Sequence, residues 1–460
     1  MEIRGDKTGM RTLWRLAWPA IVEQILTTMV NYVDTAMVGV LGAAGTAAVS
    51  VNTAAIWLAN SLLIGTGVGY SVQVSNAIGA GDDEKVRRVL RQGVLAVAVV
   101  GLTGLLIFQC LADFIPRWLG AEPEVLPQAV AYLRCYTLAM PFMAAGQIFG
   151  AILRCMGNTR APLVFNTAAN LLNVVLNFLL IYPTRPAQIF GWEIVIPGAG
   201  LEAAGAAIAS AAALTAAGIA MLLAGTRQSE RYRVHLRGSF RPEGDIIRQA
   251  VRLGLPSTVE RATINLGQIA MTTVVASLGT VALAANQIAV TAEGLCYLPA
   301  FGISYAGIAL VGQAVGAGNR RDAAAYGSLA ARLGFLVSVI TASTLFLLAP
   351  LLSGLFNSDA RVVEQAALML RIVVFSEPCF ALFIVLSGCL RGAHDVRMPM
   401  VAGLVCMWCV RVPLAYLLVY GAELGLTGVW LAMDADLILR GVLCTLRWRS
   451  GRWAKRCGLG

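Results

Sequence analysis

Long apolar stretches separated by short polar segments fill nearly the whole chain. A membrane-spanning helix needs roughly 20 consecutive apolar residues. Twelve stretches meet this length, approximately over residues 13–40, 45–73, 90–112, 125–153, 161–182, 200–224, 250–278, 281–311, 327–351, 361–390, 400–420 and 424–446. The pattern therefore predicts an all-α polytopic membrane protein with twelve transmembrane helices.

The twelve predicted helices form two related sets of six, because the sequence repeats itself. A shift of 237 residues superimposes the stretch from Pro19 to Pro162 on the second half without a gap. Matched positions include Glu23 with Glu260, Gly79 with Gly316, Pro141 with Pro378, and Leu153-Arg154 with Leu390-Arg391. Six is an even number, so both copies enter the membrane from the same side and the repeats are parallel. Repeats of this kind place a transport site between two moving halves.

A polar segment separates the two copies. Residues 227–245 are rich in charge and carry Gly238, Pro242 and Gly244, which are typical of a linker. We therefore expect an N-terminal six-helix lobe over 1–226, a cytoplasmic linker over 227–245 and a C-terminal six-helix lobe over 246–460. The first copy also has about 14 extra residues around 183–197, which we expect to form a solvated external loop.

Composition and charge agree with a membrane protein and orient it. The chain is 58% hydrophobic and 13% charged, whereas soluble domains carry about 25% charged residues. The net charge of +10 comes from 32 Arg and 3 Lys, most of which flank the helices on one face. The positive-inside rule then predicts a multi-pass protein of the cell inner (plasma) membrane with both termini in the cytoplasm. Topology alone explains the basic face, so we expect no nucleic-acid partner.

A group of polar side chains lies within the predicted helices of the first copy. Asp34 lies about 20 residues into the first helix, among apolar neighbours, where an ionisable group is a functional candidate by default. Glu23 lies three turns earlier on the same face, about 16 Å away along the axis. In the fifth helix, Asn173 and Asn177 follow Asn170 at helical spacing and share one face with it.

These polar groups have two interpretations. A hard cation prefers several oxygen ligands that include a carboxylate. Asp34 with the side-chain carbonyls of Asn173 and Asn177 supplies such a set, and Ser210 of the sixth helix adds a hydroxyl. Asn and Ser also serve as hydrogen-bonding residues between membrane helices. The candidate cation-binding residues are therefore Asp34, Asn173, Asn177 and Ser210.

The second copy has a different set of charged residues. Met271 occupies the position equivalent to Asp34. Five carboxylates are candidates for substrate binding or ion coupling: Glu23, Glu260, Glu293, Glu377 and Asp434. Asp436 and Arg440 form an i,i+4 pair that we expect to be structural. Arg261 and Arg411 are expected to neutralise Glu260 or its neighbours.

Several segments resemble prokaryotic members of the multidrug and toxic compound extrusion (MATE) family. The resemblance rests on residues 18–24, 33–42, 255–257, 284–288, 312–318 and 390–399, the last being close to the family loop LRGxxDxRxP. Residues 153–162 are a degenerate version of that loop. The resemblance covers nearly the whole chain. It implies two six-helix lobes in a V, cation-coupled export and alternating access.

The resemblance also bears on the candidate site. Asp34, Asn173 and Asn177 fall where the N-lobe cation site of the family lies, and Ser210 matches a Thr or Ser position there. Many proton-linked members have Asp where this chain has Asn177, a difference that favours Na⁺ while H⁺ stays open. Acidic positions of the family on helices 7 and 10 are not matched, since the nearest carboxylates here lie one to two turns away.

These observations together predict a non-enzymatic, monomeric antiporter in the lipid bilayer. We expect it to use Na⁺ or H⁺ as coupling ion, to need no other cofactor and to export organic, preferentially cationic, drugs or metabolites. The alternative within transport is a lipid-linked saccharide flippase of the same superfamily. Its cavity is typically basic, whereas the charged residues embedded in the predicted helices, away from the helix ends, are more often acidic than basic here. A membrane-embedded transferase is the remote alternative.

Overall fold

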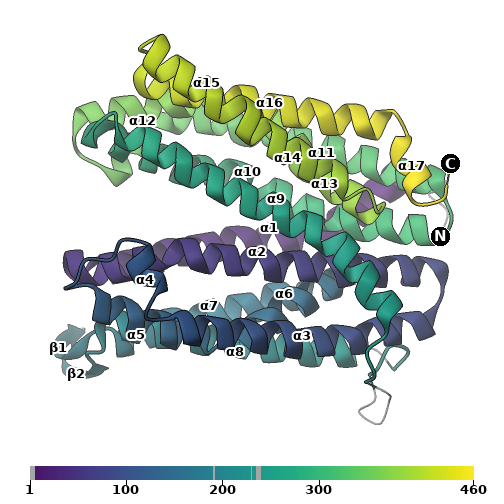
Figure 1. Ribbon diagram of the computed structural model, residues 1–460, viewed down its shortest axis with the longest axis horizontal. Helices are drawn as coiled ribbons and strands as arrows, with labels where there is room; N and C mark the ends of the chain where they lie inside the picture. Colours follow the sequence, from purple (N-terminus) through teal and green to yellow (C-terminus); the bar gives the residue numbers. More distant parts are fainter. Residues whose placement is uncertain (1–5, 190–191, 229, 235–239, 460) are drawn as a thin grey trace.

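The computed structural model of the protein describes residues 6–189, 192–228, 230–234 and 240–459, and it is almost entirely helical (Figure 1). The first lobe comprises α1 (Asp6–Gly39), α2 (Gly42–Ala80), α3 (Asp83–Leu111), α4 (Ile115–Trp118), α5 (Leu126–Thr137), α6 (Met140–Cys155), α7 (Arg160–Leu180), β1 (Pro183–Ile189), β2 (Trp192–Ala199) and α8 (Glu202–Arg227). The second lobe comprises α9 (Gly244–Ala276), α10 (Thr280–Gly316), α11 (Arg320–Phe356), α12 (Ala360–Val373), α13 (Glu377–Gly392), α14 (Arg397–Val405), the π-helical turn η1 (Cys406–Arg411), α15 (Val412–Tyr416), the π-helical turn η2 (Leu417–Gly421), α16 (Gly425–Arg449) and α17 (Arg452–Arg456).

The helices account for the twelve predicted membrane spans. Among the described residues, seven spans are single stretches long and apolar enough to cross a bilayer, and two more are bent helix pairs, α5 with α6 at 48° and α12 with α13 at 58°. Pro141 and Pro378, which match in the repeat, lie in the first turn after each break and end the preceding helix. The long helices α1, α9 and α16 coincide with the three remaining predicted stretches.

Two details differ from the sequence-based expectation. Several helices are longer than their apolar stretches: α2 has 39 residues and α10 and α11 have 37 each. At 1.5 Å per residue such a helix is about 55 Å long, so its ends project beyond the hydrocarbon core. The extra segment of the first copy is not a plain loop, because β1 and β2 pair as antiparallel strands.

The two copies share packing as well as sequence. Three side chains of α1 form hydrogen bonds with side chains of α7, and in each pair the two residues are 143 positions apart in the sequence. The pairs are Glu23 with Asn166, Thr27 with Asn170, and Asp34 with Asn177. The same offset joins Gln268 of α9 to Arg411, and Ser277 to Tyr420. The first helix of each copy also crosses to the other lobe, since α1 packs against α10 and α9 against α2.

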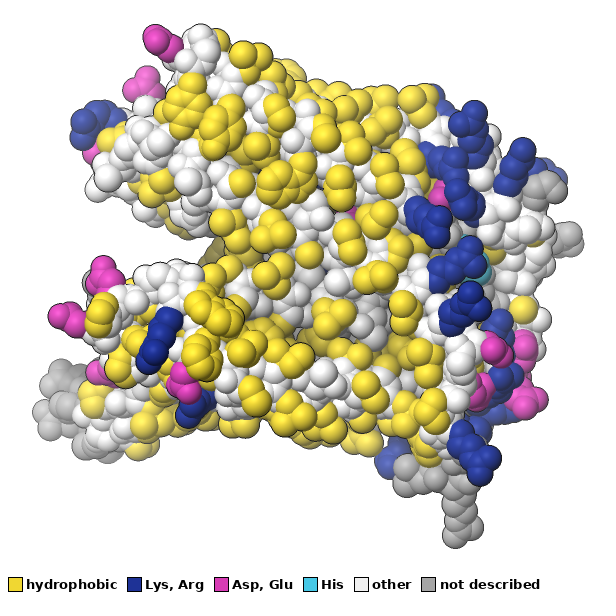
Figure 2. Space-filling view, viewed as in Figure 1, with side chains coloured by type: hydrophobic (Ala, Val, Ile, Leu, Met, Phe, Trp, Pro, Cys, Tyr) yellow, Lys and Arg dark blue, Asp and Glu magenta, His cyan; other side chains and the backbone are white. Residues whose placement is uncertain are grey.

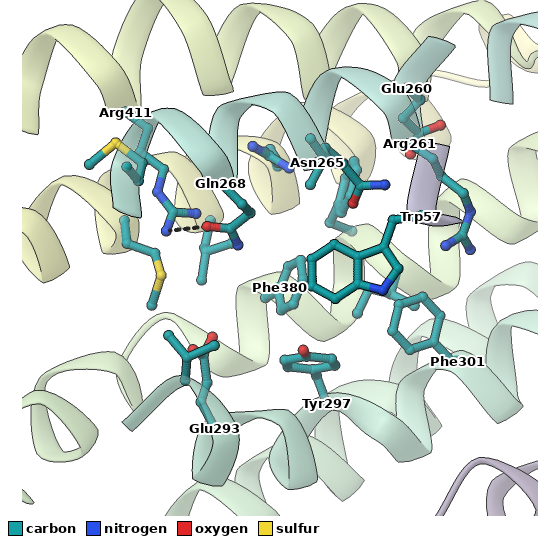
Figure 3. A pocket seen from close by; sticks show the side chains of 18 of the residues that line it. Trp57, Glu260, Arg261, Asn265, Gln268, Glu293, Tyr297, Phe301, Phe380 and Arg411 are labelled. Atoms are coloured by element: carbon teal, nitrogen blue, oxygen red, sulfur yellow. Dashed lines mark hydrogen bonds between the residues drawn. The ribbon is translucent and has the colours of Figure 1, made fainter. Parts of the chain in front are cut away.

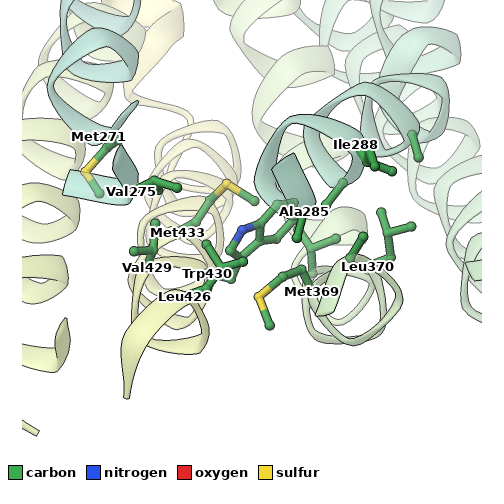
Figure 4. Close-up of a cluster of buried hydrophobic side chains, with 14 of the residues drawn as sticks. Met271, Val275, Ala285, Ile288, Met369, Leu370, Leu426, Val429, Trp430 and Met433 are labelled. Atoms are coloured by element: carbon green, nitrogen blue, oxygen red, sulfur yellow. The ribbon is translucent and has the colours of Figure 1, made fainter. Parts of the chain in front are cut away.

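A buried apolar cluster fills the part of the second lobe that corresponds to the Asp34 region (Figure 4). Met271, the equivalent of Asp34, is 3% exposed there. Trp430 lies at the centre of the cluster, and its indole N–H donates to Asn286 Oδ1 at 3.0 Å. Dense apolar packing therefore replaces, in the second lobe, the polar contacts that the first lobe makes at this level.

The molecule has two distinct ends. Both termini lie at one end in Figure 1, and Lys and Arg side chains gather there in Figure 2. This basic end contains the starts of α3, α11 and α14 and the end of α16, with Lys85, Arg88, Arg320, Arg397 and Arg449. At the opposite, open end the two lobes separate and the surface is deeply hollowed (Figure 2).

Close contact between the lobes seals the basic end. A Cβ added to Gly79 of α2 would collide with the backbone carbonyl of Gln313, and one added to Gly316 of α10 would collide with that of Asn76. These two glycines are equivalent in the repeat, so the same close approach occurs twice between α2 and α10. The structure is thus closed at the basic end and open at the other.

Candidate functional site

A chain of polar side chains connects three helices of the first lobe. Asn177 Nδ2, on α7, donates to Asp34 of α1 and also to Asn173 Oδ1 at 3.2 Å. Asn173 Nδ2 in turn donates to Ser210 Oγ on α8 at 3.2 Å. The structure therefore brings all four predicted cation-binding residues together. Asn170 does not belong to this group, because its amide reaches Thr27 Oγ1 at 3.5 Å instead.

The Asp34 group contains an unused oxygen. Asn177 is fully buried, yet its Oδ1 has no hydrogen-bond donor among the described residues. A buried carbonyl without a donor is costly, and a cation would supply the missing partner. Together with the Asp34 carboxylate and the Ser210 hydroxyl, this oxygen makes a set of ligands suited to a hard cation. Tyr132 and Tyr136 of α5 lie near the Asp34 carboxylate, and sequence reasoning did not anticipate them.

Glu23 is held in a salt bridge rather than exposed to a pathway. Its Oε1 accepts from Arg154 Nη2 at 2.5 Å and from Asn166 Nδ2 at 2.6 Å, and the Glu23 side chain is 2% exposed. The Arg154 guanidinium also stacks over the ring of Tyr305 in the second lobe, 4.6 Å from its centroid. Glu23 therefore shares the α1 face of Asp34, as predicted, but connects α1 to α6, α7 and, through Arg154, to α10.

The second lobe repeats this ion pair. Arg391 Nη2 donates to both oxygens of Glu260, at 2.9 and 2.8 Å. Arg391 is the equivalent of Arg154 in the repeat, so each copy carries a buried Glu–Arg pair at the same place. Arg261 and Arg411 were expected to neutralise Glu260 or its neighbours, but the ion pair with Glu260 itself is made by Arg391. Arg261 stacks over Phe301 at 6.0 Å, and Arg411 lies 3.8 Å from Asp436.

A cavity of about 560 Å³ lies between α2 and the second lobe (Figure 3). Trp57, Tyr297, Phe301 and Phe380 form its aromatic walls, and Glu293 lies on its floor as drawn. Its charged lining consists of two glutamates and four arginines: Glu260, Glu293, Arg261, Arg391, Arg411 and Arg440. Glu260 and Glu293 thus line the cavity as coupling or substrate candidates, whereas Glu377 and Asp434 do not contribute to its lining.

Glu293, Glu377 and Asp434 form a second acidic group. Glu377 is fully buried and lies against both the Glu293 carboxyl group and the Cys296 thiol. Asp434 accepts from Ser376 Oγ at 2.7 Å. Two neighbouring buried carboxyl groups can bind one cation or share one proton.

The buried carboxylate of Asp436 is paired, as expected. Arg440 donates to both oxygens of Asp436, at 2.6 and 2.7 Å, and both side chains are almost completely buried. Arg411 Nη2 donates to Gln268 Oε1 at 3.4 Å (Figure 3). Arg261 is the cationic side chain of this cavity that has no ion-pair partner among the described residues.

Comparison with known proteins agrees with this geometry. The MatE family model matches the chain twice, at residues 19–179 and 256–417, and the two matches begin 237 residues apart. A relative from Thermotoga maritima, described as probable multidrug resistance protein NorM, is 29% identical over 452 residues. The alignment covers 98% of this chain and 94% of the relative.

Solved structures of transporters have the same fold. A transporter from Pyrococcus furiosus superimposes with a TM-score of 0.88 at 22% identity, covering 98% of this chain and 97% of that one. That transporter is described as having a binding pocket of reverse polarity, which suggests a different function for it. The outward-facing conformation of a multidrug resistance MATE transporter superimposes with a TM-score of 0.87 at 21% identity, covering 97% and 96%. These likenesses establish the twelve-helix, two-lobe fold.

Proposed function

Because the chain belongs to the MATE family, we propose that it is a cation-coupled antiporter that exports organic compounds by alternating access. The observation that carries the proposal is the Asp34 group, in which a carboxylate, a hydroxyl and an unsatisfied buried carbonyl oxygen lie within one lobe. Drug export is supported by the description of the Thermotoga maritima relative. We further propose that a monomer with lobes over 1–226 and 246–460, joined by 227–245, performs transport with no cofactor besides the ion.

The charge distribution supports an outward-facing state. Excess Lys and Arg marks the cytoplasmic side of membrane proteins, so we assign the basic end to the cytoplasm. The hollow at the open end then faces outward, and the contacts at Gly79 and Gly316 close the cytoplasmic side. In this state the Asp34 group, toward the open end of α1, is placed to receive a cation from outside.

Binding of the ion changes a contact between helices. A cation at Asp34 competes with Asn177 Nδ2 for the same carboxylate. Its arrival therefore alters the contact of α1 with α7, and α1 also packs against α10 of the other lobe. Ion occupancy in the first lobe can in this way bias the closure of the two lobes. Coupling requires that the ion and the exported compound prefer different states.

The membrane potential is sufficient to drive such export. One positive charge moving inward through about 100 mV releases roughly 2.3 kcal/mol. At about 1.4 kcal/mol per tenfold change in concentration, this sustains a gradient of about 40-fold.

The cavity of the second lobe suits an organic cation on one side. Glu293 provides a carboxylate, and Tyr297, Phe380 and Trp57 provide aromatic faces that attract cationic ligands. Because Glu377 lies next to Glu293, the same acidic group can also take up a proton or a second ion.

One observation favours the flippase as a second candidate. The cavity lining contains four arginines and only two glutamates. The other carboxylates of the second lobe discussed above, Glu377, Asp434 and Asp436, do not line the cavity, so its wall is more basic than the lobe interior as a whole. Arg261, which has no ion-pair partner among the described residues, is suited to an anionic group such as a lipid-linked diphosphate. The Pyrococcus furiosus transporter is likewise described as having a binding pocket of reverse polarity, which suggests a different function for that protein.

Efflux from proteoliposomes tests the two candidates against each other. Ethidium movement is measured with an imposed Na⁺ or H⁺ gradient, with and without an ionophore that collapses it. Ethidium efflux that follows one gradient and is lost in Asp34→Asn, but not in the neighbouring control Asn170→Ala, supports the antiporter. Absence of gradient-driven ethidium movement, together with Arg261-dependent flipping of a lipid-linked saccharide, would favour the flippase.

A further inference from the structure

A second cavity, of about 890 Å³, lies at the basic end and is separate from the proposed transport site. The start of α1, the end of α2 and the turn before α7 wall it on one side, and the end of α10 and the start of α11 wall it on the other. Its polar lining includes Thr12, Arg15, Asn158, Thr159, Arg160 and Tyr326. The cavity therefore lies between the two lobes on the side that is closed in this structure.

The cavity has an excess of positive charge. Neither Arg15 nor Arg160 has an ion-pair or hydrogen-bond partner in the part of the chain that the structure describes. The acidic side chain of the lining, Asp322, is engaged by Asn319, whose Nδ2 donates to Asp322 Oδ2 at 2.9 Å. Arg160 is also the first residue of α7, a helix of 21 residues whose amino-terminal dipole adds to the positive potential.

The equivalent place in the second copy is occupied by a side chain. Gly157, in the turn before α7, has φ +86° and leaves open space where a Cβ would be. The equivalent residue in the second copy is His394, which has φ +62°. The Nε2 atom of His394 is buried, and the imidazole lies near Lys85 and Arg252. Arg252 is itself the equivalent of Arg15. An imidazole therefore fills in the second copy the space that the first copy leaves open beside its arginines.

We propose that the cavity beside Arg15 and Arg160 is a phosphate-binding site, distinct from the Asp34 group and from the cavity of the second lobe. Two unpaired guanidinium groups present forked donors that match phosphate oxygens, and the hydroxyl of Thr159 adds a neutral donor. The ligand is a phosphate group carried either by an anionic phospholipid or by a soluble phosphate compound. The volume admits a group considerably larger than a bare phosphate ion.

The surroundings of the site place it at the level of lipid headgroups. Trp14 and Trp18 of α1, on either side of Arg15, are 47% and 37% exposed. Tryptophan is enriched where membrane helices meet the headgroup region, and anionic lipids are abundant in the cytoplasmic leaflet. Gln313 and Tyr326 of the second lobe also line the cavity, so a bound group that contacts them as well as the arginines would favour the conformation in which the basic end is closed.

The test compares four forms of the purified full-length protein in detergent. They are the wild type, the double variant Arg15→Gln/Arg160→Gln, the variant Gly157→His and the control Arg397→Gln. Arg397 is the equivalent of Arg160 on the same basic end, beside the filled position. Unfolding temperature is titrated with dioleoylphosphatidylglycerol, with dioleoylphosphatidylcholine as the uncharged reference, and separately with inorganic phosphate.

We expect saturable stabilisation of the wild type and of Arg397→Gln by the anionic probe. Losing two charge-assisted contacts should weaken apparent binding at least roughly tenfold in the double variant. Gly157→His keeps both arginines but places an imidazole in the open space beside them, and it should weaken binding likewise. Because the second copy already carries His with left-handed φ at this position, we expect this variant to fold.

The two sources give different results. Stabilisation by phosphatidylglycerol alone identifies a lipid site, and stabilisation by inorganic phosphate identifies a soluble ligand. The proposal is overturned if neither probe stabilises the wild type more than the double variant. It is equally overturned if Arg397→Gln loses as much binding as the double variant, since the effect would then be that of any basic surface charge.

Discussion

Replacing Asn177 with Asp should change the ion that drives transport. In the wild type, Asn177 Nδ2 donates to the Asp34 carboxylate. An aspartate at this position places two carboxylates at hydrogen-bond separation. At about 3 Å and an effective dielectric constant of about 20, two unit negative charges repel by about 5.5 kcal/mol.

This repulsion far exceeds the ~1.4 kcal/mol that corresponds to a tenfold change in an equilibrium. We therefore expect the pair of carboxylates in Asn177→Asp to retain one proton at neutral pH. If Na⁺ drives the wild type, release and uptake of that proton then replace binding of Na⁺, so efflux in the variant should follow the H⁺ gradient and lose its dependence on Na⁺.

The assay is ethidium efflux from proteoliposomes under a Na⁺ gradient alone and under an H⁺ gradient alone. Asn170→Asp is the matched control, because it adds the same charge on the same face of α7 but bonds to Thr27 rather than to Asp34. If Asn177→Asp keeps the Na⁺ dependence of the wild type, Asn177 does not belong to the ion site and the reasoning is refuted.

Three further predictions concern the second lobe and the turn before α14. Glu260→Gln leaves the Arg391 guanidinium buried without its carboxylate, so we expect the free energy of unfolding to fall by about 3–5 kcal/mol. SDS-induced unfolding measures this loss, and the double variant Glu260→Leu/Arg391→Met should recover stability. A normal unfolding midpoint in Glu260→Gln would contradict the pairing. Glu377→Gln removes one carboxylate of the buried acidic group, and initial efflux rates should fall at least about tenfold; unchanged rates would exclude Glu377 from coupling. Burial and two nearby cationic side chains lower the pKa of His394, so the unfolded chain binds more protons below about pH 6.5 and stability should decline as pH falls. Unfolding temperatures at about pH 7.5 and about pH 5.5 should differ less in His394→Asn than in the wild type, and an equal difference would contradict the assignment.

The sequence was sufficient for the architecture because the membrane limits the possibilities. Unsatisfied backbone groups are excluded from the bilayer core, so each long apolar stretch had to be a helix. The repeat supplied the parallel arrangement of the lobes, and the structure extends it to side-chain contacts. The hairpin of β1 and β2 was missed, since this segment has no equivalent in the second copy and its composition resembles that of a loop.

The candidate ion site was predictable because its residues follow helical spacing. Asn173 and Asn177 share a face of α7, and only contact with α1 was needed to join them to Asp34. The partner of Glu23 was missed, although the information was present. Glu23 and Arg154 recur together as Glu260 and Arg391, so the repeat itself contained the pairing, whereas proximity in sequence suggested Arg261 instead.

The lining of the second-lobe cavity was not predictable in the same way. Which of several buried charges face a cavity depends on the rotation of each helix, and helix rotation is set by packing against neighbours. Glu293 of α10 faces the cavity, while Glu377 of the neighbouring helix α13 is enclosed by protein. Counting the charges embedded in apolar segments therefore predicted an acidic excess, whereas the cavity wall contains more arginines than glutamates.

Reciprocity of coupling provides the most direct test of the central claim that an ion bound at Asp34 drives export. If ion and exported compound are linked through two states, a gradient of one must move the other. The measurement is ²²Na⁺ or proton movement in proteoliposomes driven by an imposed ethidium gradient, for the wild type and Asp34→Asn. We predict ion movement opposite to the ethidium flux in the wild type and none in the variant. Ethidium flux without ion movement in the wild type, or equal ion movement in both proteins, would contradict the account.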